Sequence, residues 1–346
     1  MRLALFSDIH GNLVALEAVL ADLAARGPYD ALGVAGDLCE SGPDPRAVLA
    51  RLRGLSAVLS VPVAMVQGNN DRYLTVDDPR ALRALGKGRK AIDGIAWTRD
   101  QLSADDIAFL AALPFAHTFA NPSPLGPGSA GVSPVPDPGS AGVSPVPDPG
   151  SAGVSPVPDP TRGRASSVGS VPRSQADSSR TLQRQAQDRG RRHWWNRWPR
   201  HRQREQVRQQ QAQDQQRGAG QGQDLLMVHA NTRDLETHID PDASPAEVAR
   251  LLAGIPETAT AVAFGHLHIP YARRVDGRLL IDVASVGHPK DGDPRAAYAV
   301  AEFRDGAWQA AIHRVAYDVE KTVAAIRASG MPHPKKRIDD LRKASY

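Results

Sequence analysis

The chain has 346 residues, a formal net charge of +4 and a single cysteine, and its length suits one large domain or two small ones. One cysteine excludes an internal disulfide and is typical of a reducing compartment. No apolar stretch is long enough to cross a membrane, and the apolar run before Asp8 is too short for a secretory signal, so we expect a cytoplasmic protein.

The first third of the chain predicts alternating strands and helices. Short apolar runs at 3–6, 31–35 and 61–66 are predicted to be buried strands. Between the first two, apolar residues recur at helical spacing over 12–27, and residues 45–55 are predicted to form a second helix. Strands separated by crossover helices indicate a parallel sheet.

The middle of the chain has a different composition. The unit GSAGVSPVPDP occurs three times in tandem over 128–160, and an Arg- and Gln-rich tract follows. Residues 123–223 hold 14 Arg against 7 acidic residues, so the positive charge of the chain lies there. Such Pro, Gly and Ser content cannot bury enough surface to offset chain entropy. We therefore predict 1–122 and 224–330 as two parts of one domain, 123–223 as a disordered insertion, and 331–346 as a basic C-terminal tail.

Two interpretations of the Arg- and Trp-rich tract at 161–217 remain open. It could be an arm for nucleic acid or another anionic surface, with Arg on phosphates and Trp stacked on bases. It could equally be a solvated insertion without a binding role. Low-complexity composition favours the second interpretation.

The segments on either side of the insertion predict shorter strands, hairpins and helices. The Ser103 and Ser244 positions are predicted helix caps, and Asp276-Gly277 is a predicted hairpin turn. The predicted strands are 115–119 with its continuation at 224–228, then 261–264, 271–275, 279–283, 297–303 and 308–315, before a helix at 319–328. Early parallel strands and late hairpins predict a mixed sheet or two packed sheets.

Metal-competent side chains follow five of the predicted strands. They are Asp8 and His10, Asp37, Asn69, His229, and His266 with His268. Ligands of open α/β sheets bind at the carboxyl ends of the strands, so these side chains are expected to gather at one edge. Two carboxylates, one amide and four imidazoles suit Mn, Fe, Co, Ni or Zn. Seven ligands exceed the needs of one catalytic ion and suit two ions that share a carboxylate. Taken alone, a single His is more often a surface or core residue than a ligand, and an Asp after a strand is more often a turn former or a helix cap.

The motifs D-x-H, G-D, G-N-x-D, an isolated His and G-H-x-H occur in that order. With SDIHGN at 7–12, GDLCESGPDP at 36–45 and SVGHPKDGDPRAAYAV at 285–300, this chain resembles the calcineurin-like metallophosphoesterase superfamily. It is most similar to the small bacterial and archaeal phosphodiesterases, over 1–121 and 224–317.

The resemblance implies a fold, a ligand set and a reaction. The fold is a four-layer αββα sandwich. Asp8, His10 and His268 would hold one divalent ion, Asn69, His229 and His266 a second, and Asp37 would bridge them. Manganese is the first expectation for both ions, with iron, nickel, cobalt or zinc as alternatives. A hydroxide bridging the metals would attack a phosphoester, with Asp37, Asn69 and His229 as the catalytic residues.

Position 70 distinguishes this chain from many members of the superfamily, which have His there. Asn70 carries no titratable proton, so it cannot act as a general acid, a role that typically contributes about 10²–10⁴-fold. We therefore expect a small phosphodiester or nucleotide as the substrate rather than a phosphomonoester. Asn70, His288 and Lys290 are candidate substrate contacts, although His288 and Lys290 would fit a solvated turn equally well.

Two other functions fit the same sequence. The superfamily includes a retromer subunit, which implies that this fold can be a non-catalytic scaffold that binds proteins. The basic insertion could instead tether a phosphoesterase to nucleic acid. A degraded ligand set would favour the scaffold, but every ligand position is filled here.

Overall fold

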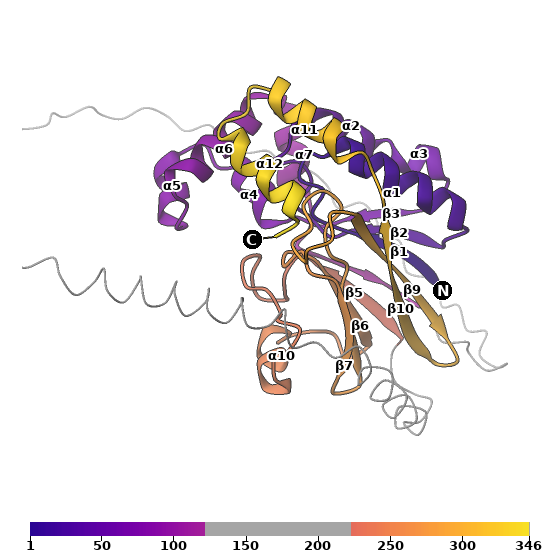
Figure 1. The fold of residues 1–346 in the computed structure, drawn as a ribbon. Coiled ribbons are helices and arrows are strands. Elements are labelled where there is room, and N and C mark those ends of the chain that lie inside the picture. Colours follow the sequence, from indigo (N-terminus) through magenta and orange to yellow (C-terminus); the bar gives the residue numbers. More distant parts are fainter. Residues whose placement is uncertain (122–222, 346) are drawn as a thin grey trace, which may run out of the picture. The chain divides into compact units, whose positions relative to one another are not determined.

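The computed structural model describes residues 1–121 and 223–345, which contain two five-stranded mixed sheets and the helices around them (Figure 1). The predicted repeats and the tract at 161–217 lie outside the described residues. Of the predicted insertion only Gln223 is described, and its carbonyl accepts a hydrogen bond from Trp308 Nε1 (2.7 Å). No helix within the described ranges is long and apolar enough to cross a membrane.

The first sheet has the order β10-β9-β1-β2-β3 and the second β4-β5-β6-β8-β7. In each sheet three neighbouring strands are parallel, and antiparallel strands complete it. The strands of the first are β1 (Arg2–Phe6), β2 (Ala31–Val34), β3 (Val63–Met65), β9 (Ala296–Arg304) and β10 (Ala307–Val315). Those of the second are β4 (Ala116–Phe119), β5 (Asp224–Val228), β6 (Ala259–Phe264), β7 (Tyr271–Val275) and β8 (Arg278–Asp282).

Alternation along the strands produces the layers, because successive side chains of a strand point to opposite faces. Leu3 and Leu5 of β1 pack in one cluster with Leu225 and Met227 of β5, between the sheets. Phe6 of β1 packs instead with the helices on the outer face of its sheet. Helices therefore cover two sheets that face each other, and the predicted four-layer αββα sandwich is confirmed.

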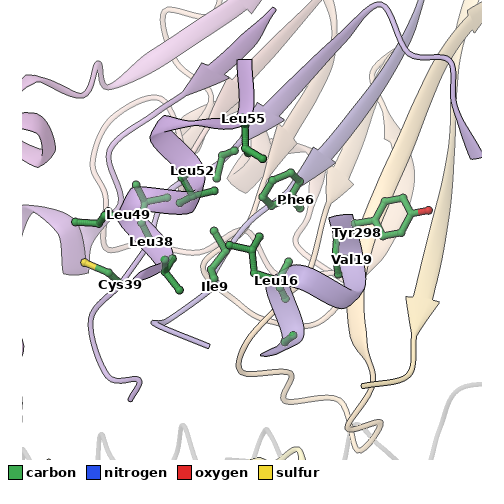
Figure 2. Packing of buried hydrophobic residues seen from close by; sticks show 14 of the residues in the cluster. Phe6, Ile9, Leu16, Val19, Leu38, Cys39, Leu49, Leu52, Leu55 and Tyr298 are labelled. Atoms are coloured by element: carbon green, nitrogen blue, oxygen red, sulfur yellow. The ribbon is translucent and has the colours of Figure 1, made fainter. Parts of the chain in front are cut away.

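Two helical layers cover the outer faces. Against the first sheet, Leu16 and Val19 of α1 and Leu49 and Leu52 of α2 pack around Phe6 (Figure 2). Against the second sheet, α10 contributes buried apolar side chains to a separate cluster. The helices are α1 (Leu13–Arg26), α2 (Pro45–Arg53), α3 (Leu55–Leu59), α4 (Asn69–Leu74), α5 (Pro79–Ala84), α6 (Arg89–Asp100), α7 (Ala104–Ala112), α10 (Pro245–Leu251), α11 (Val319–Ala328) and α12 (Pro334–Lys343).

The structure departs from the predicted elements in three places. The segment at 224–228 is not a continuation of the preceding strand, because β5 pairs antiparallel with β4. Helices α4, α5 and α6 occupy stretches that we did not predict as helical. The segment described above as a basic tail contains α12, and Ile338 and Leu341 of this helix pack against Val323 and Ile326 of α11.

Candidate metal centre

The seven residues predicted as metal ligands lie together where the two sheets meet at one edge. Hydrogen bonds join the sheets there: the backbone N–H of His266 donates to Asp8 Oδ2 (2.9 Å), and His229 Nδ1 donates to the Ala35 carbonyl (2.7 Å). Gly265 permits this approach, since a Cβ at that position would lie 2.2 Å from Ser7 Oγ and 2.3 Å from Asp8 Oδ2.

One group of side chains comes mainly from the first sheet. Asp8 Oδ1 lies 3.1 Å from His268 Nε2 and 3.7 Å from His10 Nε2. His10 Nε2 lies 3.7 Å from Asp37 Oδ2 and 3.3 Å from His268 Nε2. Four potential ligands, Asp8, His10, Asp37 and His268, thus converge within reach of a single ion.

A second group shares Asp37 with the first. His229 Nε2 lies 3.6 Å from Asp37 Oδ1 and 2.8 Å from Asn69 Oδ1. His266 Nδ1 lies 3.1 Å from both Asn69 Oδ1 and His229 Nε2. Asp37 therefore directs one carboxylate oxygen toward each group, which is the arrangement that a bridging carboxylate needs.

Each of the four imidazoles has one ring nitrogen against a backbone carbonyl. His10 Nδ1 faces the Glu40 carbonyl (3.0 Å), His229 Nδ1 that of Ala35 (2.7 Å), His266 Nε2 that of Glu236 (2.9 Å) and His268 Nδ1 that of His288 (2.5 Å). A carbonyl only accepts, so these nitrogens carry the protons and the other nitrogen of each neutral ring presents a lone pair to the centre. Metal-bound His residues are oriented in this way.

The electrostatics of the centre favour a positive charge. Burial alone would raise the pKa of Asp8, but the neighbouring imidazoles, His268 first, lower it well below its usual value. Burial opposes a charge on His229, yet Asp37 and Asp8 raise the pKa of its imidazole. Burial and the neighbouring His229 lower the pKa of His266 to about 4, which leaves that ring neutral and able to act as a ligand.

Backbone strain is concentrated at the same residues. Asp8, His10, Asp37, His266 and His268 have φ values between +49° and +70°. Non-glycine residues rarely adopt this left-handed conformation, and where it clusters it marks functional sites. Five of the seven predicted ligands carry it.

The donor set fits divalent transition metals. Asp8 Oδ1 is buried and has no hydrogen-bond partner among the described residues. The facing nitrogen pairs, His10 with His268 and His229 with His266, are lone-pair acceptors that a shared cation would satisfy. Carboxylate, imidazole and amide donors without thiolate suit Mn, Fe, Co, Ni or Zn.

The segment after β3 holds Asp37 in place. The Asn70 backbone N–H donates to Asp37 Oδ1 (2.9 Å), and Asn70 Nδ2 donates to Asp37 Oδ2 (2.5 Å). Asp71 accepts from the backbone N–H groups of Asp37 (2.9 Å) and Gly68 (2.8 Å). Asn70, predicted as a substrate contact, is thus turned toward the shared carboxylate.

His288 and Lys290, the other predicted substrate contacts, lie beside the first group. The His288 ring centroid is 5.6 Å from that of His10 and 5.4 Å from that of His268, and its Nε2 is buried. Burial and the cation of Arg337 lower the pKa of Lys290 to about 8.

Helix α12 adds a residue that sequence reasoning missed. Arg337 is 7% exposed, and its Nε and Nη1 have no hydrogen-bond partner in the part of the chain that the structure describes. One turn further on, Asp340 Oδ2 lies 4.0 Å from His288 Nε2, so α12 covers this side of the centre. No sequence signal distinguished Arg337 from the other cations of a basic segment.

The family of the chain follows from comparison with known proteins. Residues 1–117 match the calcineurin-like phosphoesterase family, and residues 186–306 match the calcineurin-like phosphoesterase superfamily domain. The chain belongs to the calcineurin-like phosphoesterase superfamily. This family membership confirms the resemblance found in the sequence motifs.

Two solved structures share the fold at low sequence identity. A metallophosphoesterase from Sphaerobacter thermophilus is 21% identical with a TM-score of 0.55, and covers 99% of this chain and 100% of that one. The hypothetical protein PH1004 from Pyrococcus horikoshii OT3 is 13% identical with a TM-score of 0.61, covering 98% of this chain and 97% of that one.

Two curated relatives are similar over a short stretch. They are symmetrical bis(5'-nucleosyl)-tetraphosphatases from Pectobacterium carotovorum subsp. carotovorum (strain PC1) and Pectobacterium atrosepticum. Each is 40% identical over 74 residues, which is 21% of this chain and 25% of the relative. The chain thus spans about a quarter of the length of these relatives.

Proposed function

We propose that this phosphoesterase hydrolyses phosphodiesters with two divalent metal ions, manganese being the first candidate. One group, Asp8, His10 and His268, would hold the first ion, and Asn69, His229 and His266 the second, with Asp37 shared. When bound, such a pair of ions supplies Lewis acidity toward the phosphoryl oxygens and activates a water molecule. The observation that carries the proposal is Asp37, whose two oxygens face the two groups separately.

The residues around the ions favour a diester over a monoester. Asn70 holds Asp37 through two hydrogen bonds and has no proton to give to a leaving oxygen. Substrates whose leaving group is already stable as an anion need that proton least. The name of the short curated match supports a nucleotide substrate with phosphates on both sides of the scissile bond.

The substrate would lie toward the loop after β8 and helix α12. The Lys290 backbone N–H donates to the His268 carbonyl (3.2 Å), the His288 ring lies beside that of His268, and Asp340, on the same helix as Arg337, lies 4.0 Å from His288. Arg337 and Lys290 would neutralise phosphate charge, and His288 Nε2 would hydrogen-bond a phosphate oxygen. These three are proposed as binding residues and not as ligands of the ions.

The test compares a diester with a monoester on the same enzyme. The full chain is freed of metal, reloaded with Mn²⁺, and assayed on bis-p-nitrophenyl phosphate and p-nitrophenyl phosphate, with His229→Ala as the blank. The expected result is Mn²⁺-dependent turnover that is faster on the diester, is lost in His229→Ala, and is accompanied by about two Mn²⁺ per wild-type chain.

A different outcome would change the assignment. If the folded chain binds Mn²⁺ but turns over neither compound, nor a dinucleoside polyphosphate, the diesterase proposal is wrong. The non-catalytic scaffold would then be the better description of this protein.

A further inference from the structure

The amide of Asn69 has two chemically different ends, and only one of them can serve a cation. Its Oδ1 lies 2.8 Å from His229 Nε2 and 3.1 Å from His266 Nδ1. Its Nδ2 donates to Tyr73 Oη at 3.3 Å. A rotation of the amide by half a turn would place N–H groups where an oxygen is needed and would repel a metal ion.

Tyr73 is the residue that distinguishes the two orientations. It lies four residues after Asn69 on α4, so both side chains project from the same face of the helix. Its hydroxyl donates to Glu236 Oε1, which leaves the phenolic oxygen as an acceptor facing Asn69. Burial, and then this hydrogen bond, raise the pKa of Tyr73, so the phenol keeps its proton at any working pH.

Glu236 is held from two further directions. Lys87 Nζ lies 3.6 Å from Glu236 Oε2 and 3.9 Å from the centroid of the Tyr73 ring. The backbone carbonyl of Glu236 accepts from His266 Nε2 (2.9 Å). One residue of the loop between β5 and α10 thus touches both the imidazole of His266 and the tyrosine that faces Asn69.

We propose that Tyr73 and Glu236 are positioning residues that keep the oxygen of the Asn69 amide directed at the second ligand group. Asn69 Nδ2 donates to Tyr73 Oη, and the Tyr73 hydroxyl donates to Glu236. Because the Glu236 carboxylate can only accept, the hydrogen bonds run in this direction and the nitrogen of the Asn69 amide faces Tyr73. The inference rests on the proposed function in one respect, that Asn69, His229 and His266 hold a cation.

The test is a double-mutant cycle on metal binding, which needs no substrate. Mn²⁺ is titrated calorimetrically into the metal-free full chain, and the site of interest is the one lost in His229→Ala. Tyr73→Phe is expected to raise the dissociation constant of that site about 10–100-fold, the usual effect of losing a partner of a ligand. The other Mn²⁺ site should change little.

The second arm separates orientation from packing. In Asn69→Asp the two carboxylate oxygens are equivalent, so no orientation needs to be held. Adding Tyr73→Phe to that variant should then change the dissociation constant by less than about twofold, giving a coupling of about 1–3 kcal/mol between the two positions. Tyr271→Phe is the matched control, because it removes a buried hydroxyl that donates to the Ile239 carbonyl at 2.7 Å on the same loop.

Three results would overturn the proposal. The first is Mn²⁺ binding by Tyr73→Phe that equals that of the wild type. The second is an equal loss of affinity whether Tyr73→Phe is made in the wild type or in Asn69→Asp, and the third is the same loss in Tyr271→Phe. Either of the last two would indicate general loosening of the loop. If the coupling is found but no phosphodiester is hydrolysed, the positioning role stands and the proposed function fails.

Discussion

Gly68 is the residue at which the structure makes its sharpest steric prediction. It is the N-cap of α4 and lies against the Asp37 backbone. A Cβ at this position would lie 2.2 Å from Asp37 Oδ1 and 2.3 Å from Asp37 N, where ordinary contact begins at 3.4 Å. The carboxylate can rotate, but the backbone nitrogen cannot. Gly68→Ala must therefore move either α4 or the loop after β2 by roughly 1 Å.

The cost of that shift can be estimated. Forcing extra atoms into a packed site typically costs about 1–3 kcal/mol of unfolding free energy. The shift also separates the Gly68 and Asp37 N–H groups that share Asp71 Oδ2 (2.8 and 2.9 Å), and each hydrogen bond to a charged group contributes about 1.5–3 kcal/mol. We expect Gly68→Ala to lose about 2–4 kcal/mol and to bind Mn²⁺ more weakly, because Asn69 follows directly.

Gly88 is the matched control. It is the N-cap of α6 with φ −76° and ψ 164°, close to the −92° and 169° of Gly68, and a Cβ there would meet nothing within 4 Å. The loss of a glycine cap is therefore common to both variants. Urea unfolding and Mn²⁺ titration of each check the prediction. Equal stability and equal metal affinity of Gly68→Ala and Gly88→Ala would refute the steric reasoning.

Three further predictions concern Asp282, Arg337 and Asn70. Burial raises the pKa of Asp282 well above 3.8, so between the unfolded pKa and the raised native pKa the native state holds a proton that the unfolded chain has lost. In that range this group makes wild-type stability fall as the pH rises, by at most about 1.4 kcal/mol per unit. Asp282→Asn should lack this fall in urea unfolding measured in steps upward from pH 4, and parallel curves for the two proteins would contradict it. Arg337→Met should raise KM for bis-p-nitrophenyl phosphate about tenfold, which corresponds to about 1.4 kcal/mol of binding free energy. Arg342→Met is the control, because Arg342 is on the same helix but is exposed and paired with Glu320, and it should leave KM unchanged. Identical KM values for the two variants would show that Arg337 does not contact the substrate. Asn70→His restores a titratable group, so hydrolysis of an alkyl monoester such as glycerol 2-phosphate should rise about 10²-fold, and no rise would show that the leaving oxygen lies elsewhere.

Local patterns were enough to predict most strands and the residues that gather at one edge of the sheets. Apolar runs that end in Asp, Asn or His mark the carboxyl ends of buried strands, as at Asp8, Asp37 and His229. Helix α10 was predictable because Ser244 and Glu247 form a capping box with Pro245 at the first position. These signals lie within a few residues of each other, so they survive without any knowledge of the tertiary fold.

Helix α4 was not predicted because the sequence of its first turn is typical of a loop. Gly-Asn-Asn-Asp is typical of turns, and the helix begins there because Asp71 accepts from the Gly68 backbone N–H and because Tyr73 and Leu74 are buried. Had the helix been predicted, the four-residue spacing of Asn69 and Tyr73 would have indicated their contact.

The sequence by itself determined the superfamily, the layered fold and which residue types gather at the sheet edge, since motif order and strand periodicity are local properties. Only the tertiary structure decided what surrounds those residues. Glu236 contacts Tyr73 and His266 from a loop, and Asp340 of α12 approaches His288, although both lie more than a hundred residues away from Asn69 along the chain. Their contacts depend on how separate elements pack, and packing leaves no periodic trace in the sequence.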